Sequence, residues 1–226
     1  MTLRRLSTLL LLALGLLAGC GEEASGEGAA QLWVTRDRGA EVVLTAHVPA
    51  GISAMEALRR QADVETRYGG RFVQSVEGIE GGLTEQRDWF FYVNGYEADR
   101  SASDYTLHDG DVLWWDYRAW GEQLRMPVVV GAFPEPFLHG YDGRRRPAVV
   151  EGKPSESART LAKLVRGTLN GRSEGANRLI IVGGSRFRAR LSGGPGDPVV
   201  FEVGVQAARR LARKPALARF RYEGLP

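Results

Sequence analysis

The sequence predicts an α+β protein, with an N-terminal β-grasp domain followed by a small α/β domain. Two observations predict it. Between residues 32 and 120, short alternating apolar runs surround one segment of helical periodicity, which is the order of a sheet wrapped over a single helix. Beyond residue 126, strand-like runs alternate with longer segments of helical periodicity, which is typical of α/β structure.

Residues 1–20 have the features of an export signal. Arg4 and Arg5 precede an apolar run, Leu6–Leu17, that is shorter than the about 20 residues needed to cross a bilayer. The run ends in "LAGC", which resembles a bacterial lipobox, where the chain is cut before the cysteine and the cysteine is acylated. We therefore predict a lipoprotein signal peptide over residues 1–19, lipidation of Cys20, and a lipid-anchored protein on the extracytoplasmic side of the cell membrane. The alternative is an ordinary signal peptide with a spare cysteine nearby.

Charge and composition divide the rest of the chain. Residues 20–31 are mostly Gly, Ala, Ser and Glu, which predicts a flexible tether. Residues 20–126 contain 10 Lys+Arg and 19 Asp+Glu, a net −9, whereas residues 127–226 contain 18 and 8, a net +10. The change of sign predicts two domains, 32–125 and 126–226, that dock through complementary surfaces. Their sum, +1, gives no reason to expect a nucleic-acid partner.

The N-terminal domain is predicted to begin with a hairpin and a capped helix. Leu32–Asp37 and Glu41–Val48 alternate as two strands around a turn. Ser53 and Glu56 have the spacing of a capping box, so a short amphipathic helix follows. Three further strand segments complete the sheet: Arg71–Ile79, Asp88–Ala98 with a turn at Asn94-Gly95, and Asp111–Ala119.

The last two of these strands are aromatic on both faces. Ten of the chain's 20 aromatic residues lie between Asp88 and Trp120. Because side chains alternate along a strand, Trp89 and Phe91 share one face, whereas Phe90 and Tyr92 share the other. A sheet with one wet face has polar residues there, so something besides the helix must cover the second face. The C-terminal domain and a flat ligand are the two candidates, and they do not exclude each other.

The segment "DWFFYVNGYEADRSASDYTLHDGDVLWWDY" resembles the transcobalamin-like C-terminal domain family, over roughly residues 32–120. The resemblance implies a β-grasp module that lays aromatic side chains over one face of a corrin ring, with Trp89, Phe91 and Tyr105 at the matching positions. Strand geometry alone adds neighbours to this candidate site: Tyr92, Asn94, Trp115, Tyr117 and Trp120. For each of these residues the alternative is an aromatic or polar residue of a core or an interface.

The resemblance further implies a ligand-binding lipoprotein that binds a corrinoid, a cobalamin-like vitamin, as an accessory to uptake. The large helical domain that covers the other corrin face in animal carriers has no counterpart here. The second cover would be the C-terminal domain or a membrane transporter of the energy-coupling-factor type; otherwise the ligand differs. The alternative function is a non-catalytic interaction or scaffold module on the outer face of the cytoplasmic membrane.

The C-terminal domain is predicted to contain strands and two helices. The expected strands are "MPVVVGAF" (126–133), "RLIIVGG" (178–184) and "RFRARL" (186–191), and the expected helices are Ser155–Leu169 and a final one opened by Asp197-Pro198 that runs to about Arg213. Arg186, Arg188 and Arg190 alternate on one strand face, which would meet phospholipid, the acidic domain or solvent.

No catalytic or metal-binding motif is present in the sequence. The three histidines are isolated, and neither His-x-x-x-His, Cys-x-x-Cys nor G-x-S-x-G occurs. The glycine-rich "GGSRFRARLSGGPG" lacks the Lys-Ser/Thr pair of a phosphate-binding loop. We therefore expect a protein that is not an enzyme and has no metal and no catalytic cofactor.

Overall fold

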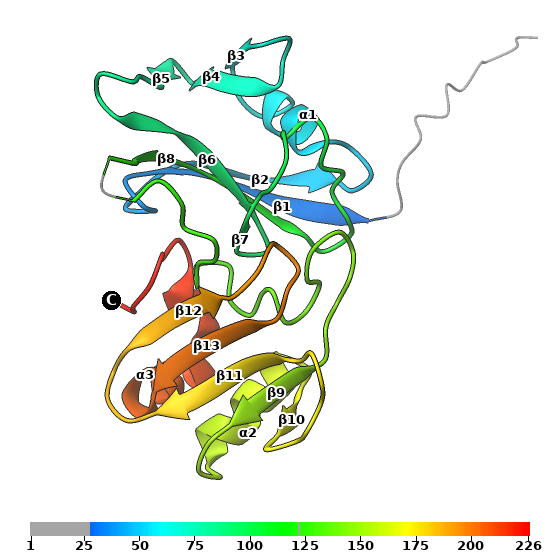
Figure 1. Cartoon of the computed structure of the whole chain (residues 1–226), viewed down its shortest axis with the longest axis vertical. Helices are drawn as coiled ribbons and strands as arrows, with labels where there is room; N and C mark the ends of the chain where they lie inside the picture. Colours follow the sequence, from blue (N-terminus) through cyan, green and yellow to red (C-terminus); the bar gives the residue numbers. More distant parts are fainter. Residues whose placement is uncertain (1–27, 122) are drawn as a thin grey trace, which may run out of the picture.

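The computed structural model describes residues 28–121 and 123–226. These residues form a mixed α+β fold, mostly strands in three sheets with a few short helices (Figure 1). Over the described part of the chain, no helix is long and apolar enough to span a bilayer. The predicted signal peptide, Cys20 and most of the predicted tether lie outside the described residues.

The first sheet contains five strands: β1 (Ala29–Arg36), β2 (Glu41–Pro49), β6 (Arg87–Val93), β7 (Tyr96–Glu97) and β8 (Val112–Ala119). Their order is β2-β1-β8-β6-β7, with β1 and β8 parallel and the other neighbours antiparallel. The predicted hairpin of β1 and β2 is confirmed. The turn at Asn94-Gly95 is also confirmed, and both of its residues have positive φ, as a two-residue hairpin turn requires.

One face of the first sheet is covered by helix α1 (Ala54–Arg59) and a small sheet of strands β3 (Val64–Arg67), β4 (Phe72–Val76) and β5 (Ile79–Glu80) (Figure 1). The Ser53 hydroxyl caps α1 as predicted and accepts the N–H of Glu56 at 3.1 Å. The predicted strand Arg71–Ile79 is interrupted at Glu77-Gly78, where both residues have positive φ. β3 was not predicted, because its sequence, VETR, has little apolar alternation.

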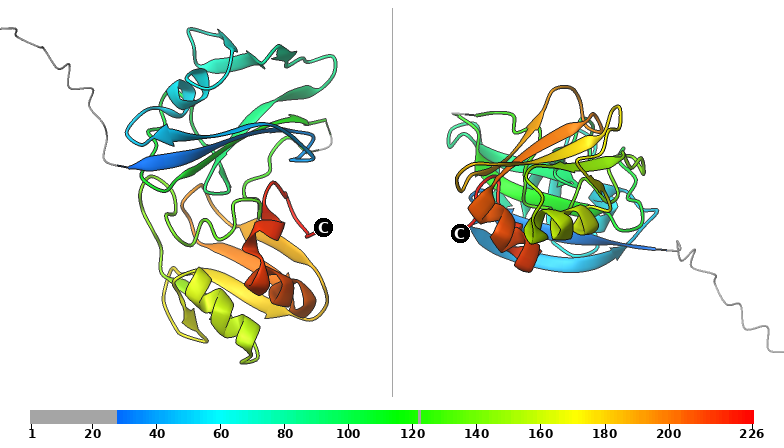
Figure 2. Two further views of the ribbon diagram at one scale, coloured as in Figure 1. Left: turned by 180° about the vertical axis from the view of Figure 1, so that it is seen from behind. Right: turned by 90° about the horizontal axis from the view of Figure 1, so that it is seen from below.

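The second sheet also has five strands: β9 (Ala148–Glu151), β10 (Thr168–Leu169), β11 (Asn177–Val182), β12 (Phe187–Leu191) and β13 (Val199–Gly204). The order is β10-β9-β11-β13-β12, and only β12 is antiparallel to its neighbour among these described strands. Helices α2 (Glu156–Leu164) and α3 (Val205–Arg213), with the 3-10 turn η1 (Pro215–Ala218), cover one face (Figure 2). The opposite face faces the viewer in Figure 1, and no helix of the described part of the chain covers it.

Three element predictions for the C-terminal part are wrong. Residues 126–133 form no strand: among them only Val128 makes a bridge, to Tyr96. Val129 and Ala132 are buried in the core between the sheets, whereas Val130 and Phe133 are buried in the larger core. The first helix ends at Leu164 instead of Leu169, because Arg166 has positive φ and the chain turns into β10. Asp197-Pro198 opens strand β13, since Val199 and alternate residues after it are buried, and the final helix begins after Gly204.

The second aromatic face of the first sheet is covered by the C-terminal part of the chain, as one of the two candidates predicted. A separate core lies between the sheets and includes Trp33, Tyr92, Val112, Trp114, Val129, Ala132 and Tyr222. Docking by complementary charge is not what joins the two parts. Among the described residues, one ion pair crosses between them, and in it the acidic part supplies the cation, Arg100, to Asp142. An aromatic core and hydrogen bonds such as that of Tyr222 to Asp116 join the two parts instead.

Candidate functional site

Two cross-strand aromatic pairs occupy the face of the first sheet that looks toward α1. Trp89 of β6 lies opposite Tyr117 of β8, with ring centroids 5.3 Å apart, and Phe91 lies opposite Trp115, stacked at 4.8 Å. Cross-strand register places these four side chains on one face. We call Trp89, Phe91, Trp115 and Tyr117 the aromatic ladder. The alternation predicted for β6 and β8 is thus confirmed.

Strand β5 lies over one end of the aromatic ladder. The indole Nε1 of Trp89 donates to the carbonyl of Ile79 at 2.9 Å, and the hydroxyl of Tyr117 donates to the carbonyl of Glu80 at 2.9 Å. The guanidinium of Arg87 lies 4.8 Å from the Tyr117 ring centroid, in a cation–π contact. The ladder is therefore covered by backbone that two side chains hold in place.

At the other end of the ladder, one buried polar group has no hydrogen-bond partner among the described residues. Trp115 is only 2% exposed, and its Nε1 has no hydrogen-bond partner among the described residues. Its stacking partner Phe91 is half-buried. A buried indole N–H without an acceptor costs free energy, so a ligand that brings an acceptor to it would be favoured.

The structure places the other predicted site residues elsewhere. Tyr92 is fully buried on the opposite face, in the core between the sheets, where burial raises its pKa to about 12. Asn94 is buried in its turn, donates to Asp111 at 2.7 Å and accepts the N–H of Val112 at 2.8 Å. Trp120 follows β8, half-buried. Of the eight predicted ligand contacts, the ladder brings four together.

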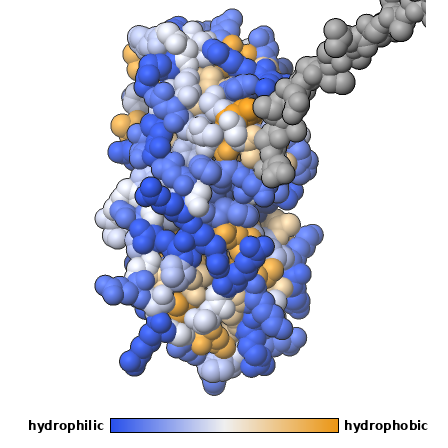
Figure 3. Space-filling view, turned by 90° about the vertical axis from the view of Figure 1, so that its right-hand side faces the viewer, coloured by the Kyte–Doolittle hydropathy of each residue, from blue (hydrophilic) through white to orange (hydrophobic). Residues whose placement is uncertain are grey.

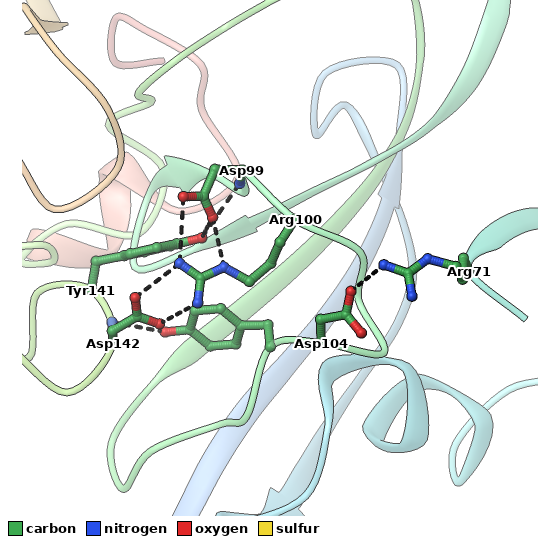
Figure 4. A network of polar contacts seen from close by, with 7 residues as sticks. Arg71, Asp99, Arg100, Asp104, Tyr141 and Asp142 are labelled. Carbon is green, nitrogen blue, oxygen red and sulfur yellow. Dashed lines mark hydrogen bonds and ion pairs between the residues drawn. The ribbon is translucent and has the colours of Figure 1, made fainter.

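Tyr105 belongs to a polar network between the two parts of the chain (Figure 4). Its hydroxyl accepts the N–H of Asp142 at 3.2 Å, and its ring lies 5.1 Å from that of Tyr141. Arg100 lies between Asp99 and Asp142, at 2.8 and 2.9 Å. Figure 4 also shows the separate pair of Arg71 and Asp104 beside this network.

The charges in this network reinforce one another. The side-chain hydrogen bond to Asp99 is the main cause that raises the pKa of Arg100, and Arg100 in turn lowers the pKa of Asp99. Burial raises the pKa of Tyr105 and of Tyr141, so both phenols stay neutral. The network thus holds Tyr105 in place. No sequence signal identified it, because Tyr141 lies 42 positions from its partner Asp99.

Metal binding has no support in the described part of the chain. No group of three or more His, Cys, Asp or Glu residues there could hold a metal ion. The carboxylates of Asp99 and Asp142 are both paired with Arg100.

Comparisons with known proteins give one family match and distant structural similarity. Residues 51–119 match a family model described as "Domain of unknown function (DUF4430)", a range that contains the whole ladder and ends with β8. No curated protein matches the sequence. Two solved structures are similar, each with a TM-score of 0.34. A protein from Ruminococcus gnavus, to which a metal-binding role has been ascribed, is 17% identical over 41% of this chain and 98% of its own. Haptocorrin in complex with Cbi is 15% identical over 40% of this chain and 24% of its own. Over residues 51–119, this chain therefore matches the DUF4430 family model.

Proposed function

We propose that this protein is a membrane-anchored, extracytoplasmic binding protein without catalytic activity, whose N-terminal β-grasp domain binds a flat, partly apolar ligand of the corrinoid class. The observation that carries the proposal is the aromatic ladder, in which the buried Nε1 of Trp115 has no partner among the described residues and lies beside the half-buried ring of Phe91. A corrin ring offers an apolar face for stacking and amide groups at its rim that accept hydrogen bonds. Each aromatic contact contributes about 0.5–1.5 kcal/mol beyond area burial.

Ligand access requires β5 to move. Its carbonyls at Ile79 and Glu80 hold Trp89 and Tyr117, so binding exchanges these two hydrogen bonds for contacts with the ligand. Because the second aromatic face already packs against the C-terminal part of the chain, this protein contacts one ligand face only. We expect micromolar affinity, with a Kd of about 1 μM corresponding to about −8.2 kcal/mol. A membrane transporter of the energy-coupling-factor type would cover the other face.

The test is calorimetric titration of cobinamide and cobalamin into a chain of residues 21–226. All strands, helices and both cores of the described structure lie within residues 28–226, so this chain retains every packed element. Trp115→Phe replaces the indole by a smaller phenyl ring that has no N–H, and we expect it to weaken binding about fivefold, or about 1 kcal/mol. Trp114→Phe, one position away on the opposite face, is the matched control and should leave affinity unchanged.

A second function, the non-catalytic interaction module, is favoured by the low exposure of Trp89 and Trp115, at 6% and 2%. It predicts no saturable heat with either corrinoid, from a protein whose circular dichroism shows it to be folded. That outcome would overturn corrinoid binding and leave the ladder as a core. Equal losses in Trp115→Phe and Trp114→Phe would contradict the proposed role of the indole N–H.

A further inference from the structure

The open face of the second sheet carries four arginines and two glutamates. Strand register places them together: Arg188 of β12 lies beside Glu202 of β13, and Glu202 beside Ile180 of β11. We define the arginine face as Arg178, Arg186, Arg188, Arg190, Glu151 and Glu202. The opposite face packs against α2 and α3 (Figure 2), and within residues 28–121 and 123–226 no helix covers the arginine face.

Cations outnumber anions on this face. Three arginines converge on the single carboxylate of Glu202: Arg188 at 3.1 Å, Arg186 at 3.8 Å, and Arg190. Arg178 pairs with Glu151. Four guanidiniums against two carboxylates leave a formal charge of +2. Each guanidinium is a fork of several N–H donors, so donors remain free to bind phosphate oxygens.

The side chains of Arg186 and Arg190 are each 56% exposed, while Glu202 below them is 15% exposed. The arginines therefore extend past the carboxylate toward solvent. In Figure 3 the lower half of the molecule, which contains this sheet, carries long hydrophilic side chains that project outward. Half-buried Ile180, Val182 and Val200 lie between the arginine positions. Aliphatic residues between projecting guanidiniums suit the boundary between headgroups and acyl chains.

A hollow of about 990 Å³ borders this face, between the strands and the loop Asn170–Ala176. Arg172 and Arg178 both line it, with Ser173 and Ser192. Arg172 lies on the exposed part of the loop. Glu151 and Glu174 also line it, so arginines and carboxylates balance there, and the surplus of cations on this face lies around Glu202, where three arginines meet one carboxylate. None of the described strand residues on this open face is aromatic, so it offers no platform for stacking bases, which disfavours single-stranded nucleic acid.

We propose that the arginine face docks on an anionic phospholipid bilayer, with guanidiniums bound to headgroup phosphates. The aromatic ladder belongs to the first sheet, at the other end of the molecule, and stays clear of the lipid (Figure 1). This docking does not depend on ligand binding or on an acyl anchor, and it acts through the second sheet and the residues that flank its strands.

The test is flotation of the residue 21–226 chain, which lacks Cys20, with vesicles of phosphatidylcholine alone or mixed with phosphatidylglycerol. We expect binding to the mixed vesicles only, weakening with added salt because exposed charges are screened. Arg186→Glu with Arg190→Glu should weaken binding tenfold or more. Arg209→Glu with Arg213→Glu, an equal change of charge on exposed positions of α3, is the matched control and should retain wild-type binding.

Three outcomes overturn the proposal. Equal loss in the two double variants would show that binding follows overall charge and not this face. Competition by free glycerol phosphate at millimolar concentration would assign the arginines to a small soluble anion. Salt-sensitive self-association that is abolished by Arg186→Glu with Arg190→Glu, without flotation, would assign the face to the acidic part of a second copy. Arg186→Gln with Arg190→Gln, which adds no repulsion toward Glu202, should float between wild type and the glutamate variant, and thermal unfolding checks that each variant is folded.

Discussion

The hydroxyl of Tyr222 donates a 2.8 Å hydrogen bond to Oδ2 of Asp116, joining the C-terminal end of the chain to the middle strand of the first sheet. The other carboxylate oxygen accepts the Thr35 hydroxyl at 2.6 Å, and backbone N–H groups of Arg38 and Gly39 also donate to Asp116. Burial raises the pKa of this carboxyl, and the four donors oppose that effect. The contact fixes the C-terminal segment over the face of the first sheet that carries Tyr92 and Trp114.

Removing the Tyr222 hydroxyl is therefore expected to destabilise the protein. Tyr222→Phe leaves the buried Asp116 with one donor fewer, and we expect the free energy of unfolding to fall by about 1–3 kcal/mol. Urea unfolding followed by tryptophan fluorescence measures it. Tyr68→Phe is the control, because Tyr68 is 79% exposed, and should change stability by less than about 0.5 kcal/mol. Equal effects from the two substitutions would show that the hydroxyl of Tyr222 contributes nothing specific.

The pair of His139 and Glu135 should make the stability of the protein depend on pH. Nδ1 of His139 lies 2.6 Å from Oε1 of Glu135, and this hydrogen bond is the main cause that raises the pKa of His139 above 6.5, against burial, which lowers it. A raised folded-state pKa means that the pair stabilises the protein fully below the unfolded-state pKa of about 6.5, and that this contribution is lost as pH rises through the folded-state value.

Glu135→Gln should abolish most of that dependence. The stability difference between wild type and Glu135→Gln is expected to be largest below about pH 6 and to shrink at higher pH, as the imidazole of His139 loses its proton. Urea unfolding across pH measures it, and NMR titration of the His139 ring should give a lower pKa in the variant. A difference that does not vary with pH would contradict the assignment of charge to His139.

Gly131 lets the backbone of Arg221 and the ring of Trp114 lie close to its own backbone, at the core between the sheets. A Cβ built there would lie 2.7 Å from the carbonyl oxygen of Arg221 and would also meet the ring of Trp114. Gly131→Ala should therefore cost about 1–3 kcal/mol, as overpacking does. Gly194→Ala is the matched control, since nothing lies within 4 Å of its Cβ position, and should be close to neutral. Differential scanning calorimetry of both variants measures the effect. A Gly131→Ala variant that melts at the wild-type temperature would contradict this prediction.

Much of the first sheet could be predicted from local patterns. The hairpin of β1 and β2, the Ser53 cap and the turn at Asn94-Gly95 each depend on residues close in sequence, and each is confirmed. The two faces of β6 and β8 follow from simple alternation, which is why the ladder could be found. Its partners on β5 could not, because Trp89 and Tyr117 bond to backbone carbonyls, which carry no sequence signature.

The errors are concentrated where long-range packing overrides local preference. Residues 126–133 are apolar enough for a strand, but Val129 and Ala132 are buried against Trp114 and Tyr92 instead of pairing in a sheet. Tyr105 matches an aromatic position of the resemblance, yet Tyr141 and Asp142, far along the chain, determine its surroundings. Such contacts between distant residues cannot be read from spacing alone.

The cover of the aromatic ladder should open when its two side-chain hydrogen bonds are removed. Trp89→Phe with Tyr117→Phe keeps an aromatic ring at both positions, a smaller one at position 89, and deletes the bonds to the carbonyls of Ile79 and Glu80, each worth about 1 kcal/mol. The free energy of local opening of β3, β4 and β5 should fall by about 1 kcal/mol for each bond removed. Each 1 kcal/mol corresponds to an increase of about fivefold in the exchange rate.

Hydrogen–deuterium exchange with peptide resolution measures this opening. Peptides that cover residues 64–80 should exchange faster in the double variant, whereas those from β11 and β13 should be unchanged, because both strands belong to the second sheet and not to the sheet that carries the ladder. Since ligand access requires β5 to move, the double variant should also bind a corrinoid with a higher association rate. Faster exchange throughout the chain would mean that the two bonds support global stability, and unchanged exchange over 64–80 would mean that β5 is held by other contacts.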